Sequence, residues 1–295
     1  MKIFDAKSAS ARELYSYLAG AVSPRPIALV SSIDAKGLVN LAPFSFFNIF
    51  SAAPPILIFS CVDSLRDGSS KDTLYNAQET KEVVINLVNY AMVEQTSLAS
   101  TAYEKGVNEF EKAGFTAQKS ELVAPPRVAE SPVQIECSVE QIIKLGDSKG
   151  TGNLVVCRVL RMYIDKQILD KEEKIDPFKL DIVSRLGGNW YGRSKEGLFE
   201  VTKPITNLGV GIDALPKDIK ESTILSGNDL GKLGNIEQIP TPKIIDEFVE
   251  KNKKLYGLLK QNNRAEVHRF AKELLQKNEV EAAWCALLAT VKETI

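Results

Sequence analysis

The stretch Asn40-Leu-Ala-Pro-Phe-Ser-Phe-Phe-Asn48 combines side chains that a purely structural strand rarely mixes. Asn40, Ser45 and Asn48 offer hydrogen bonds among one proline and three phenylalanines. A strand with one solvated face alternates polar and apolar residues, and a fully buried strand is apolar throughout. A flat heteroaromatic ligand needs apolar contacts to its ring and a few fixed polar groups at its edge. The stretch therefore fits a ligand surface, although by itself it fits an aromatic core strand better.

Short apolar runs on both sides of this stretch predict strands. Residues 26–32 form one run, and Asp34-Ala-Lys-Gly37 is a good turn sequence, so residues 26–50 are typical of a hairpin. Residues 55–62 have the length and continuous apolarity of a core strand. Further strands are expected over residues 81–88, 133–145 and 153–164. Many short strands with few helices predict a mainly β fold, a closed or partly closed antiparallel barrel with peripheral helices.

Helical patterns are sparse before residue 203 and dominate after it. Asp72 is expected to cap a helix to about Thr80, and residues 92–103 are a second candidate. Residues 165–178 are charged and predict an exposed excursion. Further on, Thr241-Pro242 is a favoured helix start, and apolar residues recur at helical spacing up to Leu259. Helices are also expected over residues 264–275 and 279–291, which predicts a first domain over residues 1–203 and a mostly helical C-terminal extension over residues 204–295.

The segment Ser69-Ser-Lys-Asp-Thr73 stands directly before the first expected helix. Free N–H groups at a helix start attract an anion, and the hydroxyls and Lys71 add donors. The segment predicts a phosphate cradle, although a capped, solvated loop explains the same residues. Arg25 and Arg66 are further candidate phosphate partners, and ordinary surface charge is the alternative for each.

Three glycine-containing segments need separate interpretations. In Arg185-Leu-Gly-Gly-Asn-Trp-Tyr191 the glycines permit close approach of a ligand, although a plain turn also explains them. Gly209-Val-Gly-Ile-Asp-Ala214 matches the dinucleotide fingerprint on paper, but it follows no convincing strand and Pro216 comes too early for a long helix. Residues 227–232 resemble a shortened phosphate loop with the wrong spacing. Neither of the last two is expected to bind a nucleotide.

The composition bounds the remaining possibilities. The 295 residues carry a net charge of -1, so no basic field favours nucleic acid or an anionic membrane. The longest strongly apolar run, residues 56–62, is far shorter than the ~20 residues of a membrane span, and we expect a cytoplasmic protein. Four widely spaced cysteines are expected to be buried hydrophobes. The single histidine, His268, cannot make a metal site or a triad alone, so no metal is expected.

Six segments taken together resemble the flavin-reductase-like family, whose members carry a Greek-key-like split β-barrel that binds flavin mononucleotide (FMN). The resemblance covers about residues 14–203, and the segments stand in the family's usual order. They are Ser23-Pro-Arg-Pro-Ile-Ala-Leu-Val-Ser-Ser32, the stretch from Asn40 to Asn48, Pro54-Pro-Ile-Leu-Ile-Phe-Ser60, Lys71-Asp-Thr73, Val83-Val-Ile-Asn-Leu-Val88 and Arg185-Leu-Gly-Gly188. Leu225-Ser-Gly-Asn-Asp-Leu-Gly231 is similar to a long-chain subgroup.

The resemblance implies a homodimer with FMN at the subunit interface, and it assigns site roles by position. No residue receives a catalytic role. The isoalloxazine and ribityl surface is expected at Asn40, Ala42, Pro43, Phe44, Ser45, Phe46 and Asn48, the phosphate end at Lys71, Asp72 and Thr73 with Ser60 and Arg25, and pocket closure at Arg185, Gly187 and Gly188.

Three functions remain open at this point. The first is an oxidoreductase in which NADH or NADPH, as a transient co-substrate, passes hydride to FMN, and the reduced flavin passes electrons to an acceptor that the sequence does not identify. The flavin supplies the difficult chemistry, so no triad or metal cluster is required. The alternative is an FMN-binding electron carrier without intrinsic NAD(P)H activity. A third possibility keeps the barrel for haem or pyridoxal phosphate, and the lone His268 disfavours a histidine-ligated haem.

Overall fold

Valine, isoleucine and phenylalanine dominate the long strands near the N-terminal end, because such side chains suit a buried, pleated surface. The computed structural model describes residues 1–201 and 208–291. Its principal strands are β2 (Ala28–Ile33), β3 (Val39–Phe44), β4 (Phe47–Ala52), β5 (Pro55–Val62), β6 (Glu82–Leu87), β9 (Val133–Lys144) and β10 (Gly152–Ile164). They pair in one antiparallel sheet in the order β3-β2-β6-β9-β10-β5-β4. The prediction of a mainly β, antiparallel fold is confirmed.

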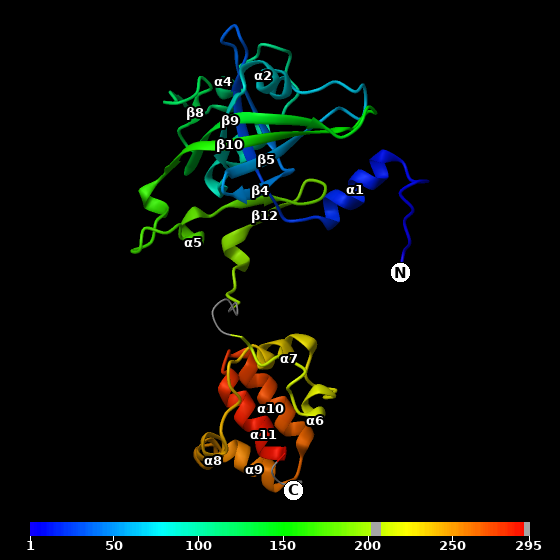
Figure 1. Cartoon of the computed structure of the whole chain (residues 1–295), viewed down its shortest axis with the longest axis vertical. Helices are drawn as coiled ribbons and strands as arrows, with labels where there is room; N and C mark the ends of the chain where they lie inside the picture. Colours follow the sequence, from blue (N-terminus) through cyan, green and yellow to red (C-terminus); the bar gives the residue numbers. More distant parts are fainter. Residues whose placement is uncertain (202–207, 292–295) are drawn as a thin grey trace. The chain divides into compact units, whose positions relative to one another are not determined.

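The two edge strands of this sheet are consecutive in the chain. β3 ends at Phe44 and β4 begins at Phe47, so the sheet has to curl until its edges meet at the two residues between them. The Phe46 carbonyl accepts a hydrogen bond from the Ser60 N–H at 2.8 Å, and the Phe44 and Phe59 rings lie 5.0 Å apart. Figure 1 shows β10 between β9 and β5, with β4 beside β5. The hairpin expected over residues 26–50 is confirmed for β2 and β3, which pair antiparallel. Its second arm is shorter than expected, because the bend after Phe44 sends β3 and β4 to opposite edges of the sheet.

The inside of the curl is filled by apolar side chains from every long strand. Phe59, Val83 and Ile85 are fully buried there. Cys61, Cys137 and Cys157 lie in the same core, and Cys285 is buried in the C-terminal part of the chain. The prediction that the cysteines are buried and unpaired is confirmed.

Smaller elements surround the sheet. A three-stranded sheet pairs β1 (Arg25–Pro26), β11 (Val183–Arg185) and β12 (Tyr191–Arg193), and a second pairs β7 (Ala117–Gln118) with β8 (Arg127–Val128). The helices are α1 (Ala11–Ala21), α2 (Asp72–Thr80), α3 (Val93–Leu98), α4 (Glu109–Ala113) and α5 (Pro177–Leu180), with 3-10 turns η1 (Tyr90–Met92), η2 (Lys166–Ile168) and η3 (Ser194–Gly197). These elements bring α3, α2 and the β11–β12 turn around β3.

Several helix predictions need correction. α1 was not anticipated, although Ser10 and Glu13 form a reciprocal capping box at its start. Lys71, not Asp72, is the N-cap of α2, and Asp72 is its first helical residue. The helix expected over residues 92–103 is α-helical only in α3. Residues 165–178 are largely exposed as expected, except that Ile168 is buried.

The chain divides into two compact units, Met1–Phe199 and Glu200–Ile295. The second unit is helical as predicted, with α6 (Lys217–Lys220), α7 (Gly227–Gly234), α8 (Pro242–Lys251), α9 (Lys253–Lys260), α10 (Arg264–Gln276) and α11 (Val280–Val291). Its core surrounds Trp284, whose indole N–H donates to the Leu233 carbonyl at 3.0 Å. The residues 227–232 that resemble a phosphate loop lie within α7, and only the short α6 follows Gly209-Val-Gly-Ile-Asp-Ala214.

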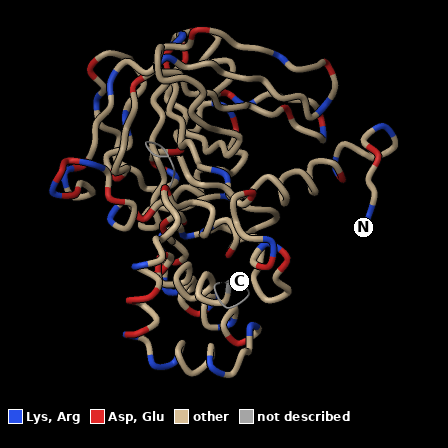
Figure 2. The backbone as a smooth tube through the Cα atoms, turned by 60° about the horizontal axis from the view of Figure 1, so that its bottom comes forward, with Lys and Arg blue, Asp and Glu red and all other residues tan. Residues whose placement is uncertain are grey.

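The charges of both units are mixed in sign. Figure 2 shows Lys and Arg positions interspersed with Asp and Glu positions along the backbone. Among the described residues, no helix combines the length and apolarity needed to cross a membrane.

Candidate functional site

Two pockets lie one after the other along β3. The first, here the Ser45 pocket, has a volume of about 580 Å³ and is lined by Ile27, Pro43, Ser45, Tyr90, Val93, Glu94, Thr96, Ser97, Ser100, Arg185, Asn189 and Tyr191. The second, here the Lys71 pocket, has a volume of about 400 Å³ and is lined by Asn40, Ala42, Val62, Ser64, Arg66, Ser69, Ser70, Lys71, Asp72, Ala99, Thr101, Ala102, Tyr103, Lys105 and Glu109. Ala42 lines the Lys71 pocket and its chain neighbour Pro43 lines the Ser45 pocket, so both pockets adjoin the same part of β3.

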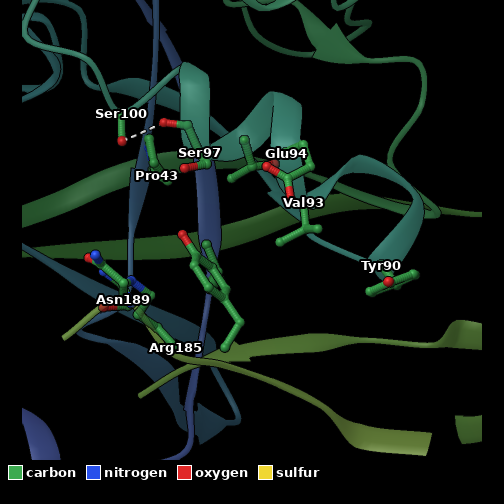
Figure 3. A pocket seen from close by; sticks show the side chains of 12 residues that line it. Pro43, Tyr90, Val93, Glu94, Ser97, Ser100, Arg185 and Asn189 are labelled. Carbon is green, nitrogen blue, oxygen red and sulfur yellow. Dashed lines mark hydrogen bonds between the residues drawn. The ribbon is translucent and has the colours of Figure 1, made fainter. Parts of the chain in front are cut away.

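The other wall of both pockets is α3 and the residues that follow it. Thr96 and Ser97 face the Ser45 pocket, and Ala99 and Thr101 face the Lys71 pocket. Figure 3 shows Glu94 and Ser97 of α3 opposite Arg185 and Asn189, with the Ser45 pocket between them. α3 and the residues that follow it thus line both pockets.

The Ser45 pocket is closed on one side by a turn between β11 and β12, residues 185–191. The Leu186 N–H donates to the Trp190 carbonyl at 3.0 Å, and the Arg185 guanidinium lies 4.6 Å from the Tyr191 ring centroid. Gly188 has a φ of +59°, which favours glycine. A Cβ added at Gly187 would lie 3.0 Å from the Gly20 Cα, so the turn packs directly on the last turn of α1. Both glycines are required by the backbone.

The Lys71 pocket combines cations with the N-terminus of α2. Lys71, Arg66 and Lys105 line it together with Asp72 and Glu109. The first N–H groups of a helix have no acceptor within the helix, and they point out of its N-terminus. Because α2 begins at Asp72, the helix adds its positive end to these side chains. This end of the site is suited to an anion.

The loop before α2 has its own internal hydrogen bonds. The Ser69 N–H and hydroxyl both donate to the Asp67 carboxylate, at 3.0 and 2.7 Å, and the Ser70 hydroxyl donates to Asp63 at 2.6 Å. Hydrogen bonds from Ser69 hold the pKa of Asp67 well below its usual range. The backbone and side-chain donors of Ser69 therefore already have an acceptor within the loop. Lys71 and Arg66 are the cations that this loop contributes to the lining of the pocket.

Glu109 is a site residue that the sequence did not indicate. It is buried, and its carboxylate accepts the Leu41 N–H at 2.9 Å, which caps the outer edge of β3. Burial raises the pKa of Glu109 above its ordinary value. The carboxylate reaches this position from α4, whose start is capped by the Asn108 side chain. No local pattern links Glu109 to β3, and only the tertiary fold brings them together.

The structure divides the expected site residues into three groups. Asn40, Ala42, Lys71 and Asp72 line the Lys71 pocket, and Pro43, Ser45 and Arg185 line the Ser45 pocket. Residues beside the pockets are Thr73, which is buried behind Asn40, and Gly187 and Gly188, which shape the turn.

The third group does not line either pocket. Phe44 is in the core, Ser60 is buried on β5, and the exposed Asn48 accepts the Ile49 N–H on β4. Phe46 contacts Tyr15, and the Arg25 guanidinium is held by backbone carbonyls, so the structure does not bring Arg25 to Lys71. For Phe44 the alternative of an aromatic core strand is closer to what is observed.

Residues of α3 and its flanks are the main part of the site that sequence reasoning missed. Tyr90, Glu94 and Ser97 line the Ser45 pocket, and Tyr103 and Lys105 line the Lys71 pocket. The helical signal over residues 92–103 was available, but it carries no chemistry of its own. Within the described part of the chain, no group of three or more His, Cys, Asp or Glu side chains is placed to hold a metal ion.

Comparison with solved structures places this fold. Component B of nitrilotriacetate monooxygenase from Bacillus cereus superposes with a TM-score of 0.63 at 30% identity, over 69% of this chain and 98% of that one. A flavin reductase described as having a split barrel domain, from Shewanella frigidimarina, gives a TM-score of 0.59 at 21% identity, over 69% of this chain and 100% of that one. The curled sheet is thus a split β-barrel, and the family match described next makes the chain a flavin-binding oxidoreductase.

Sequence comparison makes the assignment more specific. Residues 20–178 match the model of the flavin reductase like domain. A protein of Halalkalibacterium halodurans is 39% identical over 199 residues, which are 67% of this chain and 94% of that protein. The chain belongs to the flavin reductase like family, and the helical unit from Glu200 onward lies outside the matched domain.

Proposed function

We propose that the chain binds FMN along β3 and passes electrons from NADH or NADPH through it. The observation that supports this proposal best is the order of the two pockets. The Ser45 pocket has aromatic and hydrogen-bonding residues for a flat ring, and the Lys71 pocket has cations and a helix N-terminus for a phosphate. FMN has these two ends joined by a flexible ribityl chain. Ala42 of the Lys71 pocket and Pro43 of the Ser45 pocket are adjacent, and the ribityl chain would lie beside them.

The residues of the chain bind and orient the cofactor in this proposal. Lys71 and the first N–H groups of α2 hold the phosphate, with Arg66 at the rim. Pro43 and Ser45 contact the ring edge, and Tyr191 lies beside the ring. When bound, FMN supplies an acceptor for hydride and a donor of electrons. Residues of β3, α3 and the 185–191 turn would shield the bound ring from water where they contact it.

Exposed apolar residues support a homodimer with FMN at the subunit interface, which is part of the same proposal. Ile49 and Phe50 of the edge strand β4 are 71% and 63% exposed, and Tyr15, Leu18 and Val22 of the α1 region are also exposed. Edge strands and apolar patches of this kind are usually covered by a partner. β4 begins directly after Ser45 and Phe46, so a second copy bound there would stand next to the ring end of the site.

The first experiment is flavin titration of the purified protein, followed by NADH and NADPH oxidation with FMN present. We expect FMN to bind in a 1:1 ratio per chain and a nicotinamide to be oxidised well above background. Flavin binding without nicotinamide oxidation would favour the electron-carrier alternative. Absence of flavin binding would contradict both, and an absorbance spectrum would then test for haem or pyridoxal phosphate. Light scattering of the holoprotein measures the dimer.

Lys71→Ala tests the orientation of the cofactor. We expect FMN affinity to fall about tenfold, equivalent to about 1.4 kcal/mol, with little change for riboflavin, which lacks the phosphate. Lys36→Ala, in the exposed turn before β3, is the matched control and should change neither affinity. An equal loss of affinity for the two flavins in Lys71→Ala would contradict the proposed binding of the phosphate in the Lys71 pocket.

A further inference from the structure

Arg25 is a buried arginine, and four hydrogen bonds to protein acceptors hold its guanidinium. One terminal nitrogen donates to the carbonyls of Ala19 and Val22, the latter at 2.8 Å, and the other donates to the Leu186 carbonyl at 3.1 Å. The Nε–H points at the Ser45 hydroxyl oxygen at 3.5 Å. The residue is only 7% exposed, and it is not among the residues that line the Lys71 pocket.

These contacts use four of the hydrogen-bonding directions of a group that has five donors. A buried guanidinium needs its donors satisfied, and moving it to a phosphate would leave three backbone carbonyls without their partner. Ala19 and Val22 belong to the end of α1, where carbonyls lack partners within the helix. The Arg25 side chain therefore supplies donors to two carbonyls at the C-terminal end of α1, whose C-cap residue is Val22.

The same guanidinium connects α1 to the turn of residues 185–191. It reaches the Leu186 carbonyl at the point where Gly187 packs on Gly20. This turn carries Arg185 and Asn189, which line the Ser45 pocket. The position of that wall thus depends on one side chain that does not itself line the pocket.

Ser45 is the acceptor that Arg25 contacts besides the three carbonyls, and it lines the Ser45 pocket. A guanidinium can only donate, so Ser45 Oγ is the acceptor in this pair. The hydroxyl hydrogen of Ser45 is then directed away from Arg25, and Ser45 presents a donor to whatever lies in the Ser45 pocket. Phe46 is fixed by the same group, because the guanidinium carbon lies 5.6 Å from its ring centroid.

We propose that Arg25 is a positioning residue for the ring end of the flavin site, holding the 185–191 turn and orienting the Ser45 hydroxyl as a donor to the ring. This assignment rests on the proposed function, and it replaces the phosphate role expected from the sequence. Ser45 then donates to a ligand group that accepts a hydrogen bond, such as a ring nitrogen or carbonyl of the isoalloxazine.

The test compares FMN and riboflavin on Arg25→Met and Arg25→Lys. We expect each variant to weaken both flavins by about the same factor, near tenfold, so that the ratio of the two affinities stays as in the unmodified protein. The compact ammonium group of lysine does not reproduce the planar array of donors with which the guanidinium contacts the carbonyls of Ala19, Val22 and Leu186, so restoring the charge alone should not restore binding. If Arg25→Met loses FMN selectively and Arg25→Lys recovers it, Arg25 contacts the phosphate and the proposal is wrong.

A spectroscopic measurement separates positioning from simple loss of structure. Ser45→Ala and Arg25→Lys should each shift the absorbance bands of bound FMN, and the shift caused by Arg25→Lys should be smaller in a Ser45→Ala background, where only the effect of Arg25 on the 185–191 turn remains. Independent, additive shifts would contradict the orientation of Ser45 by Arg25.

A crystal structure of the unmodified protein with FMN decides the matter if the variants do not fold. The guanidinium should remain on the carbonyls of Ala19, Val22 and Leu186. A phosphate bonded to Arg25 would overturn the proposal and leave flavin binding itself intact, whereas failure of the unmodified protein to bind any flavin would contradict the proposed function instead.

Discussion

The Asn40 side-chain amide donates a hydrogen bond to the Thr73 hydroxyl at 2.8 Å, and this bond joins β3 to the first turn of α2. Thr73 is fully buried, so its hydroxyl is directed to Asn40 and not to the pocket. One side-chain pair therefore connects β3 to the start of α2, the proposed binding site of the phosphate.

Thr73→Val should uncouple the two segments of the site by removing the acceptor. An unsatisfied amide in this position costs about 1–3 kcal/mol, and we expect urea unfolding to show a loss in that range. FMN and riboflavin should weaken together, in contrast to Lys71→Ala. Thr73→Ser keeps the hydroxyl and is the matched control; a loss equal to that of valine would show that the methyl group, not the hydrogen bond, matters.

Glu109→Ala should destabilise the protein because the Leu41 N–H loses its acceptor. We expect about 1–3 kcal/mol in urea unfolding, with a much smaller loss for Glu109→Gln, whose amide oxygen can still accept. Equal losses in the two variants would indicate that packing of the side chain, and not the bond to β3, is what Glu109 contributes.

The pH dependence of Glu109 has a definite sign. Because the folded-state pKa is raised, the folded protein holds this proton more tightly than the unfolded chain does. Stability contributed by the group is present below the unfolded-state pKa and is lost as pH rises through the folded-state pKa. The unfolding free energy of the unmodified protein should therefore fall relative to Glu109→Gln as pH rises from about 4.

Gly187→Ala should separate the 185–191 turn from α1. The added Cβ would lie 3.0 Å from the Gly20 Cα and 3.5 Å from its nitrogen, and backbone atoms cannot move aside as a side chain can. We expect a loss of about 1–3 kcal/mol in stability together with weaker binding of both flavins. Gly197→Ala is the control, since a Cβ added at Gly197 would meet nothing within 4 Å. Similar results for the two would contradict the close packing of the turn.

His268 should make the helical unit less stable in mild acid. Burial lowers the pKa of His268, with Asp218 and Arg264 as the charged neighbours, so the unfolded chain takes up this proton first. Stability is fully present above the unfolded-state pKa, about 6.5, and is lost as pH falls towards the folded-state pKa. Thermal unfolding followed by Trp284 fluorescence in a Trp190→Phe background should show this loss. His268→Gln should flatten the profile, and an unchanged slope would exclude His268 as its source.

Strand positions were predictable because they rest on local composition. Residues 55–62, 133–145 and 153–164 are strands almost to the residue, as continuous or β-branched runs indicate. The bend at Ser45 and Phe46 was not predictable, because an aromatic run of this kind also fits one long strand. Curling of the sheet, a tertiary effect, selects two strands.

The candidate site was predictable only where the chemistry of a residue is visible in the sequence. Lys71 and Asn40 carry chemistry that is visible in the sequence, and they line the Lys71 pocket. Glu109 and Arg25 act on backbone groups of distant segments, Leu41 and Leu186 respectively. Such contacts leave no periodicity or motif, so Glu109 was missed and Arg25 was first interpreted through its charge alone.

The buried cysteines give each unit its own chemical reporter. Burial raises the pKa of Cys61 and Cys137 to about 12 and that of Cys285 to about 11, and only the thiolate reacts readily. Cys61 and Cys137 lie in the barrel core, while Cys285 lies in the helical unit. A thiol reagent added to the native protein therefore modifies each cysteine at the rate at which its surroundings open. Mass spectrometry of the labelled peptides would time the opening of the barrel and of the helical unit separately, in one sample and without any mutation.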